Sequence, residues 1–208
     1  MATRRFENAL RRRGYVRIAG VDEVGRGCLA GPVMAAAVIL HPARRCDGLR
    51  DSKLLTASAR DRLYGAITRR ALAWAVASCE PSEIDVLNIH RATLVAMRRA
   101  VLALDPSPDY VLIDAFRVPE LVVPQEGVVG GDGRCAAIAA ASIVAKVTRD
   151  RLMRALHDAD ARYGFDRHKG YATATHLAAI RRYGYSSIHR KTFRPPTLFD
   201  LLDTMGET

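Results

Sequence analysis

The alternation of apolar runs with helix-spaced stretches along the chain predicts an α/β fold. Apolar runs of strand length occur at residues 15–23, 30–40, 73–79 and 110–114, with shorter pieces at 121–123 and 128–129. The first two runs flank a glycine-rich turn and lie close enough in sequence to pair as a hairpin. The run at 110–114 is continuously apolar, which is typical of a strand buried in a parallel sheet.

Four other stretches have the spacing of helices. They cover residues 56–71, 82–104, 135–156 and 173–183. The first half of the stretch at 135–156 is small and apolar on all sides, so we expect it to be buried close against the sheet. Its charged second half should emerge into solvent. Strands that alternate with helices in this way indicate one α/β domain.

Composition indicates the class of protein and how the chain is divided. The chain has 208 residues, of which 49% are hydrophobic and 26% charged, as in an ordinary soluble protein. We expect a basic N-terminal arm at 1–14, a catalytic domain at 15–194 and a short tail at 195–208. The longest uncharged apolar stretch, 28–40, is too short to span a bilayer, so no membrane partner is expected. Four scattered cysteines without a C-x-x-C pair predict neither a zinc site nor a disulfide framework, and favour a reducing cytoplasm.

The positive charge is concentrated in two segments. The formal net charge is +10, and residues 134–194 carry 13 basic and four acidic side chains. Residues 1–14 carry five arginines and one glutamate, whereas residues 15–133 are balanced. Basic charge gathered in this way is typical of a protein with a polyanionic partner, nucleic acid first. A solvated basic surface without a partner is the alternative.

Four acidic residues stand at the ends of predicted elements. Asp22 and Glu23 close the first strand, Asp114 closes the strand at 110–114, and Asp132 precedes the long helix. If the two strands are parallel neighbours, three of these acids meet at one sheet edge, where α/β proteins bind ligands. A site of oxygen ligands alone suits Mg²⁺ or Mn²⁺. Two such ions would support an in-line phosphoryl displacement.

Each acid also has a simpler interpretation. Asp22 and Glu23 can be a solvated strand end or ion-pair partners, and Asp is among the favoured helix N-caps, which covers Asp132. Asp114 is more suggestive, because an unpaired carboxylate at the end of a buried strand is costly. The four acids together with the basic C-terminal segment favour a metal-dependent nuclease.

Two short motifs have the character of nucleic-acid contacts. Residues Gly25, Arg26 and Gly27 follow the first acid pair and predict either a hairpin turn or a loop whose N–H groups grip a phosphodiester or a ribose 2′-hydroxyl. His168 and Lys169 lie beside Tyr171, whose ring either packs in the core or stacks on a sugar or base.

Three further positions are weaker candidates. Lys53 follows Asp51 and Ser52 in what resembles a helix-entry signal, and it is a possible phosphate contact. Ser142 and Lys146 share one face of the long helix, so Lys146 is more than a surface charge if that face meets the site.

Taken together, the motifs closely resemble those of ribonuclease HII, the type 2 ribonuclease H. The matching stretches, in order, are residues 21–27 with 29–33, 51–53, 111–114, 131–132, 140–147, 149–151 and 168–173. They cover the chain from about residue 18 to residue 194, and this ordered set is far more specific than any one of its motifs.

The resemblance implies a ribonuclease H-like fold, with a mixed five-stranded sheet flanked by helices and a helical C-terminal part. It implies an endoribonuclease that acts as a monomer on RNA–DNA hybrids and on duplex DNA that contains ribonucleotides, in replication and ribonucleotide excision repair. Incision 5′ of a single embedded ribonucleotide, by a two-metal-ion reaction with Mn²⁺ or Mg²⁺, would leave 5′-phosphate and 3′-hydroxyl ends.

The resemblance also assigns roles to residues. The four catalytic and metal-binding acids map onto Asp22, Glu23, Asp114 and Asp132, the 2′-hydroxyl reader onto Gly25, Arg26 and Gly27, and the junction-sensing tyrosine onto Tyr171. Expected substrate contacts are Lys53, Arg134, Ser142, Lys146, His168 and Lys169. Arg134 departs from the family, which often has Lys soon after the fourth acid; Arg keeps the charge without the compact ammonium group.

Two rival hypotheses remain open at this point. A basic nucleic-acid-binding module with merely structural acids would bind in a salt-sensitive way and give no metal-dependent product. Another nuclease on the same superfold, such as a resolvase or exonuclease, would not require a 2′-hydroxyl.

Overall fold

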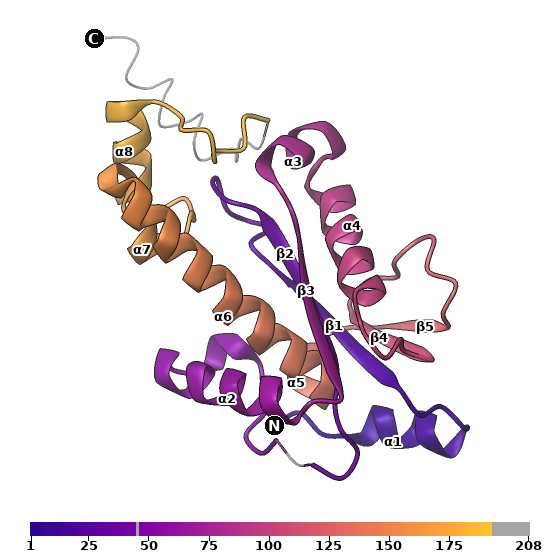
Figure 1. The fold of residues 1–208 in the computed structure, drawn as a ribbon. Coiled ribbons are helices and arrows are strands. Elements are labelled where there is room, and N and C mark those ends of the chain that lie inside the picture. The colour runs from indigo at the N-terminus through magenta and orange to yellow at the C-terminus, as the bar shows by residue number, and fades with distance from the viewer. Residues whose placement is uncertain (45, 193–208) are drawn as a thin grey trace.

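The computed structural model describes residues 1–44 and 46–192 of the chain, and the predicted tail at 195–208 lies outside them. A mixed five-stranded sheet in the order β3-β2-β1-β4-β5 forms its centre (Figure 1). The strands are β1 (Ile18–Val24), β2 (Val33–Ile39), β3 (Ala73–Cys79), β4 (Tyr110–Asp114) and β5 (Gln125–Val128). The β1–β2 and β2–β3 pairs are antiparallel, whereas β1–β4 and β4–β5 are parallel. The predicted hairpin and the predicted mixed sheet are both confirmed.

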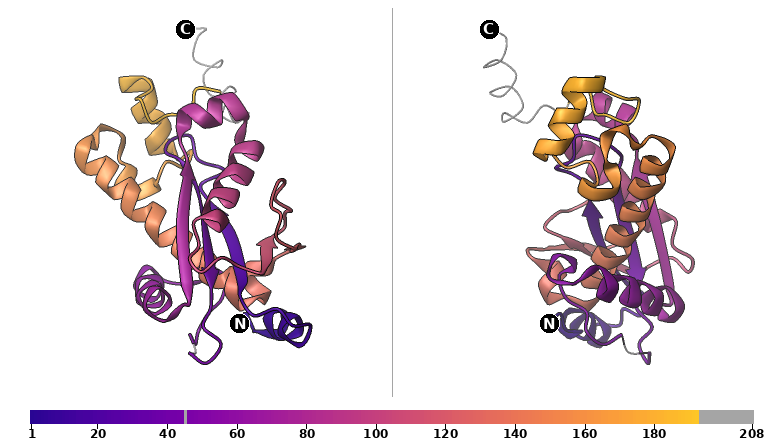
Figure 2. Two further views of the ribbon diagram at one scale, coloured as in Figure 1. Left: turned by 45° about the vertical axis from the view of Figure 1, so that its right-hand side comes forward. Right: turned by 90° about the vertical axis from the view of Figure 1, so that its left-hand side faces the viewer.

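Helices cover both faces of the sheet (Figures 1 and 2). They are α1 (Arg5–Arg12), α2 (Ala57–Arg70), α3 (Pro81–Leu87), α4 (Ile89–Leu102), α5 (Gly131–Arg134), α6 (Ala136–Ala159), α7 (Phe165–His168) and α8 (Ala174–Tyr183). Helices α3 and α4 lie on one face, and α2 and α6 lie on the other. Helices α7 and α8 gather at the C-terminal end of α6. In the described residues, no helix is both long enough and apolar enough to cross a membrane.

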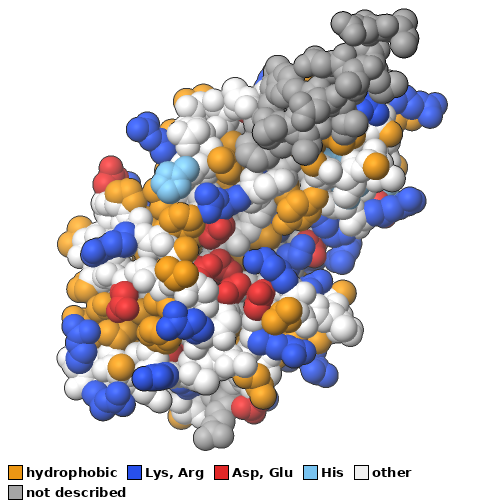
Figure 3. Space-filling model, turned by 180° about the vertical axis from the view of Figure 1, so that it is seen from behind, with side chains coloured by type: hydrophobic (Ala, Val, Ile, Leu, Met, Phe, Trp, Pro, Cys, Tyr) orange, Lys and Arg blue, Asp and Glu red, His pale blue; other side chains and the backbone are white. Residues whose placement is uncertain are grey.

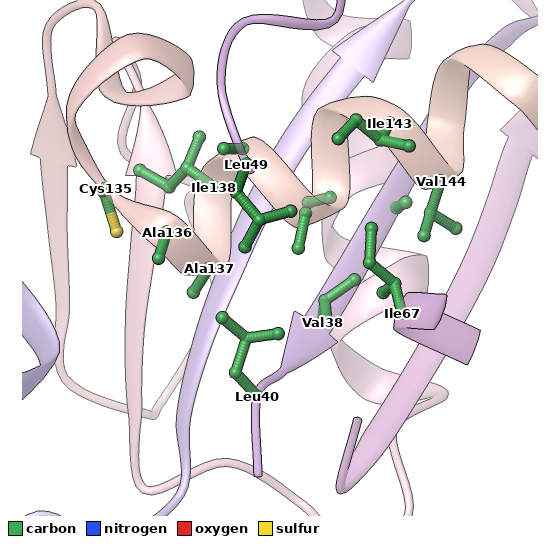
Figure 4. Close-up of a cluster of buried hydrophobic side chains, with 14 of the residues drawn as sticks. Val38, Leu40, Leu49, Ile67, Cys135, Ala136, Ala137, Ile138, Ile143 and Val144 are labelled. Atoms are coloured by element: carbon green, nitrogen blue, oxygen red, sulfur yellow. The ribbon is translucent and has the colours of Figure 1, made fainter. Parts of the chain in front are cut away.

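The long helix α6 packs closely on the sheet because its first half is made of small residues. Residues 136–141 are all buried, and a Cβ added at Gly20 of β1 would lie only 2.1 Å from the carbonyl carbon of Ala137. Further along α6, Val144 faces Val38 of β2 and Ile67 of α2 (Figure 4). Most side chains beyond residue 150 are at least partly exposed. Both predictions for this helix are therefore confirmed.

The predicted helix at 82–104 is wrong in one respect, because it is two helices. Asn88 has φ +68°, so α3 ends there, and the Asn88 side chain then accepts a hydrogen bond from the N–H of Arg91 to cap α4. The predicted strand piece at 121–123 is also wrong, because these residues precede β5 as irregular chain. Strand β1 begins at Ile18 rather than at residue 15.

The predicted N-terminal arm contains a packed helix, α1. Glu7 and Leu10 of α1 are buried, and the N–H of Ala137 donates to the Glu7 carboxylate over 2.8 Å. The chain just before α1 is also attached to the start of α6, because the N–H of Ala136 donates to the carbonyl of Thr3. The predicted domain boundaries at residues 14 and 194 stay predictions.

Candidate active site

The parallel pairing of β1 and β4 places acidic side chains side by side at the edge where both strands end. Val21 pairs with Ile113, so Asp22 and Asp114 follow at adjacent positions. Asp22 is 6% exposed, and the side chain of Glu23 is 15% exposed. The carboxylate of Asp114 accepts a hydrogen bond from the N–H of Gly131 over 2.7 Å. This bond ties the short helix α5, which carries Asp132, to the end of β4.

The carboxylates of this group repel one another. Burial raises the pKa of Asp22 well above its usual value, and the neighbouring Glu23 and Asp114 raise it further, while a hydrogen bond from Ser142 opposes the rise. Burial also raises the pKa of Glu23 and of Asp114, and the charge on Asp132 adds to the rise at Asp114. The four acids are thus close enough to share one electrostatic environment.

The donor set suits a hard cation. The Oε2 atom of Glu23 is buried and has no hydrogen-bond partner, and the neighbouring donors are carboxylate oxygens, which Mg²⁺ and Mn²⁺ prefer. A cation would offset both the repulsion and the unsatisfied oxygen. As the side chains stand, no group of three or more His, Cys, Asp or Glu residues within 1–44 and 46–192 is arranged to hold a metal ion.

Asp132 is not a helix cap, so that simpler interpretation is wrong. Gly130 precedes α5 and Cys135 precedes α6 at the capping positions, and neither helix has a side-chain cap. The side chain of Asp132 is 15% exposed, and its Oδ2 lies 4.0 Å from Nζ of the exposed Lys53. In contrast, the predicted helix-entry signal holds, because Asp51 accepts a hydrogen bond from the N–H of Lys53.

The loop after β1 places its arginine beside Glu23. Arg26 lies 3.6 Å from the carboxylate of Glu23, and its guanidinium lies over the ring of Phe116 at 4.8 Å from the ring centroid. Gly27 is exposed, and a Cβ added there would meet no atom within 4 Å. None of the residues that the structure describes therefore requires glycine at position 27.

Tyr171 stands beside this loop rather than in the core. It is 41% exposed, and its backbone forms an isolated antiparallel bridge with Cys28. A hydrogen bond from the N–H of Leu29 to the carbonyl of Gly170 adds to the pairing of these two segments. The core-packing alternative for Tyr171 is therefore wrong.

The remaining predicted substrate contacts have different surroundings. Ser142 is buried and hydrogen-bonded to Ser52 over 2.9 Å as well as to Asp22. Lys146 forms an ion pair with Asp150 at 2.7 Å. Arg134 donates to the carbonyl of Val129 and lies over the ring of Phe6, so its charge extends toward α1.

His168 is the predicted contact that the structure does not support. The side chain is 8% exposed, its Nε2 lies 2.7 Å from the carbonyl oxygen of Tyr163, and its Nδ1 accepts from the N–H of Gly170. Burial lowers the pKa of His168, so the ring is held neutral. Both ring nitrogens are bonded within the protein, so His168 has no free polar atom for a substrate. Its neighbour Lys169 is half-buried, with its ammonium group bonded to the carbonyl of Asp166.

Two buried arginines near the site were missed by reasoning from sequence alone. Arg149 of α6 and Arg190 each donate hydrogen bonds to carbonyls of the loop that follows β1. Arg149 lies in a matching stretch of the sequence, and an arginine within an otherwise apolar helix face was a signal that could have found it.

Charge on the surface is segregated. The face drawn in Figure 3 has Asp and Glu side chains gathered near its centre, with Lys and Arg side chains on several sides of them. Such a rim would attract phosphates toward the acidic centre once a cation had neutralised it.

The chain matches known proteins along most of its length. The family model described as Ribonuclease HII matches residues 19–195. A Ribonuclease HII from Azoarcus sp. (strain BH72) is 59% identical over 178 residues, covering 86% of this chain and 87% of the relative. A Ribonuclease HII from Thiobacillus denitrificans (strain ATCC 25259 / T1) is 55% identical over 190 residues, covering 91% and 92%.

Solved structures share the fold at lower identity. The ribonuclease H2 from Pyrococcus horikoshii OT3 has a TM-score of 0.73 at 23% identity, covering 93% of this chain and all of the other. RNase HII from Archaeoglobus fulgidus, solved in a complex with PCNA, has a TM-score of 0.70 at 24% identity, covering 89% and 100%. Bst-RNase HIII in complex with Mn²⁺ has a TM-score of 0.62 at 21% identity, covering 90% and 70%.

Proposed function

The chain belongs to the ribonuclease HII family, whose members are endoribonucleases with ribonuclease H activity on RNA–DNA hybrids, and we propose that it also incises duplex DNA on the 5′ side of a single embedded ribonucleotide. The observation that carries this proposal is the position of Gly27, the exposed glycine of the Gly25–Gly27 loop, four residues after Glu23. A ribose bound by this loop would therefore lie beside the four acids.

We assign the acid group to cation binding. Asp22, Glu23, Asp114 and Asp132 would hold divalent cations, and their shared repulsion and the unpaired oxygen of Glu23 support this role. Two such ions, Mg²⁺ or Mn²⁺, supply an activated water and stabilise charge on the leaving oxygen when bound. In the reaction, a water oxygen bonds to phosphorus and the P–O3′ bond breaks. The products are a 3′-hydroxyl, which takes up a proton, and a 5′-phosphate.

We assign substrate recognition to the surface around these acids. The N–H groups of the Gly25–Gly27 loop would bind the ribose 2′-hydroxyl, which is the group that distinguishes RNA from DNA. The half-exposed ring of Tyr171 would stack on the deoxyribose that follows the ribonucleotide. Lys53, Lys146, Lys169 and Arg134 would meet phosphates, and Ser142 would orient Asp22 through their hydrogen bond. Since all four cysteines are free, we place the protein in a reducing cytoplasm. We also propose that it acts as a monomer.

One cleavage assay separates the proposal from its rivals. The substrates are duplex DNA, the same duplex with one ribonucleotide, and an RNA–DNA hybrid, each with Mg²⁺, Mn²⁺ or a chelator. We expect cleavage of the last two only, with a divalent cation only. Cleavage of the all-DNA duplex would favour another nuclease of the same superfold, and binding without any product would favour a basic binding module.

Variants test the assigned residues. Asp114→Asn should lower kcat by at least about 100-fold and leave hybrid binding intact, because cation binding by this group acts on the transition state. Asp61→Asn, in an exposed ion pair with Arg151, is the matched control and should keep full activity. Full turnover by Asp114→Asn contradicts the role of Asp114.

Tyr171→Ala should lose cleavage at a single ribonucleotide, while Tyr171→Phe, which keeps the ring, retains it.

A further inference from the structure

Two arginines lie buried behind the loop at residues 25–32. Arg149 is 0% exposed and Arg190 is 1% exposed. Among the residues that the structure describes, no carboxylate lies within ion-pair distance of Arg149. A buried guanidinium is unfavourable unless hydrogen bonds replace the water that it loses. The groups that surround these two side chains therefore indicate what the arginines do.

Arg190 binds the loop at three carbonyl groups. Its Nη2 donates to the carbonyl of Gly25 over 2.7 Å, its Nη1 to the carbonyl of Arg26 over 3.0 Å, and its Nε to the carbonyl of Gly31 over 2.9 Å. The backbone of Arg190 also donates to the carbonyl of Leu29 over 2.9 Å. One side chain thus holds both the start and the end of the loop.

Arg149 binds the other side of the same loop and joins it to a second segment. Its Nε donates to the carbonyl of Pro32 and its Nη2 to the carbonyl of Ala30, both over 3.0 Å. Its Nη1 donates to the carbonyl of Lys169 over 2.8 Å. Because Lys169 lies two residues before Tyr171, Arg149 fixes the tyrosine segment relative to the loop.

The carbonyl contacts decide which way the loop's N–H groups point. In a trans peptide unit the C=O and the following N–H point in opposite directions. The carbonyls of Gly25 and Arg26 face Arg190, so the N–H groups of Arg26 and Gly27 face away from the protein interior. Within the described chain, neither N–H has a hydrogen-bond partner. Two free donors are therefore presented side by side.

The two glycines of the loop serve different partners. Gly25 has φ +92°, and a Cβ there would lie 2.3 Å from Nε of Arg149, so this glycine makes room for the buried arginine. Among the described residues, none approaches the place where a Cβ of Gly27 would be, so its small size leaves room for a group from outside the protein.

We propose that Arg149 and Arg190 are positioning residues for ribose recognition, which turn the carbonyls of the loop inward so that the N–H groups of Arg26 and Gly27 face the substrate beside Tyr171. This inference rests on the proposed reading of the 2′-hydroxyl by the loop. It gives the C-terminal part of the chain a definite role, because Arg190 and the segment around Tyr171 both belong to it.

The test uses Arg190→Lys in the full chain and two duplexes, one with a single ribonucleotide and one with a 2′-fluoro nucleotide at the same position. Lysine keeps the charge, but its single ammonium group lacks the planar fork that reaches three carbonyls. We expect kcat on the ribonucleotide duplex to fall about 10- to 100-fold with little change in KM, because misplaced donors act in the transition state. The preference for the 2′-hydroxyl over 2′-fluorine should fall by a similar factor.

The control is Met97→Ala, a fully buried residue of α4 on the other face of the sheet, which lowers stability without contact to the loop. It should leave the 2′-hydroxyl preference unchanged. If Arg190→Lys does not fold, Arg149→Lys is measured in the same way. An unchanged preference in the folded Lys variant overturns the positioning role even where overall activity falls. Absence of any 2′-hydroxyl preference in the unmodified protein would instead refute the proposed function.

Discussion

Replacing Gly20 by alanine should destabilise the protein more than any ordinary surface change, because this glycine is where the sheet and the long helix touch. A Cβ at position 20 would lie 2.1 Å from the carbonyl carbon of Ala137, 2.3 Å from the nitrogen of Ile138 and 2.4 Å from the oxygen of Ala137. All three atoms are backbone, so no side chain can rotate away. The first turns of α6 have to recede from β1.

The size of the effect follows from this distance. Ordinary contact begins near 3.4 Å, so the helix has to move by about 1.3 Å. A radial gap of about 1 Å removes a quarter to a half of each dispersion contact, and α6 is packed on β1 through fully buried residues such as Ala137 and Ile138. Overpacking in a core costs about 1–3 kcal/mol. With rigid backbone on the other side, we expect a loss of about 3 kcal/mol, which corresponds to about 6–12 °C in Tm for a domain of this size.

Urea unfolding followed by circular dichroism, with thermal melts, measures the loss. Gly133→Ala is the matched control, because a Cβ there meets nothing within 4 Å and the position is helical. Alanine should be neutral or stabilising by up to about 1 kcal/mol at position 133. If the free energy of unfolding of Gly20→Ala lies within about 1 kcal/mol of the parent value, the close approach of α6 to β1 does not stabilise the core as we infer.

Three further predictions concern buried titratable groups. Burial raises the pKa of Glu7 above its value in the unfolded chain, so the protein loses stability as the pH rises through that unfolded pKa. The stability advantage of Glu7→Gln in urea melts should therefore grow from pH 4.5 to pH 7. Burial lowers the pKa of His176 and His189 to about 4, whereas a histidine of the unfolded chain protonates near 6.5. The stability of the protein should therefore fall as the pH drops from about 6.5 toward 4, by about 1.4 kcal/mol per pH unit for each imidazole. Titration midpoints near 6.5 for these two rings in NMR spectra would contradict this. Burial and the charge on Glu23 raise the pKa of Asp22, so Asp22→Asn should raise the Tm at pH 7 in the presence of a chelator. The same variant should show a smaller gain in Tm than the parent when Mg²⁺ or Mn²⁺ is added. An unchanged gain would argue against Asp22 as a metal ligand.

The sheet and the acid group were predictable because their signals are local. A continuous apolar run such as 110–114 has few alternatives to a buried strand, and an acid directly after it is conspicuous. The break at Asn88 was not predictable from apolar spacing, because the spacing continues through it. Only the left-handed backbone and the capping bond at Asn88 separate α3 from α4.

Long-range partners account for what sequence reasoning missed. In the sequence, Glu7 is one charge in a basic arm, but its carboxylate lies under α6 and accepts a hydrogen bond from the N–H of Ala137. Arg149 and Arg190 belong to a basic segment of the sequence, although both are buried and bind carbonyls more than a hundred residues away. A charged residue that is satisfied by distant backbone has the same local signature as a solvated one.

The proposed site therefore rests on two supports. The acids are placed by the parallel pairing of β1 with β4 and by the bond from Gly131 to Asp114. The loop at 25–32 is held from the opposite direction, by Arg149, Arg190 and the segment that carries Tyr171. Because the loop is held by other side chains than those that tie the acids together, damage to the second support should change which nucleotide is accepted while cation binding persists. Damage to the first should abolish hydrolysis of every substrate, so the ratio between substrates, and not activity alone, shows which support a variant has altered.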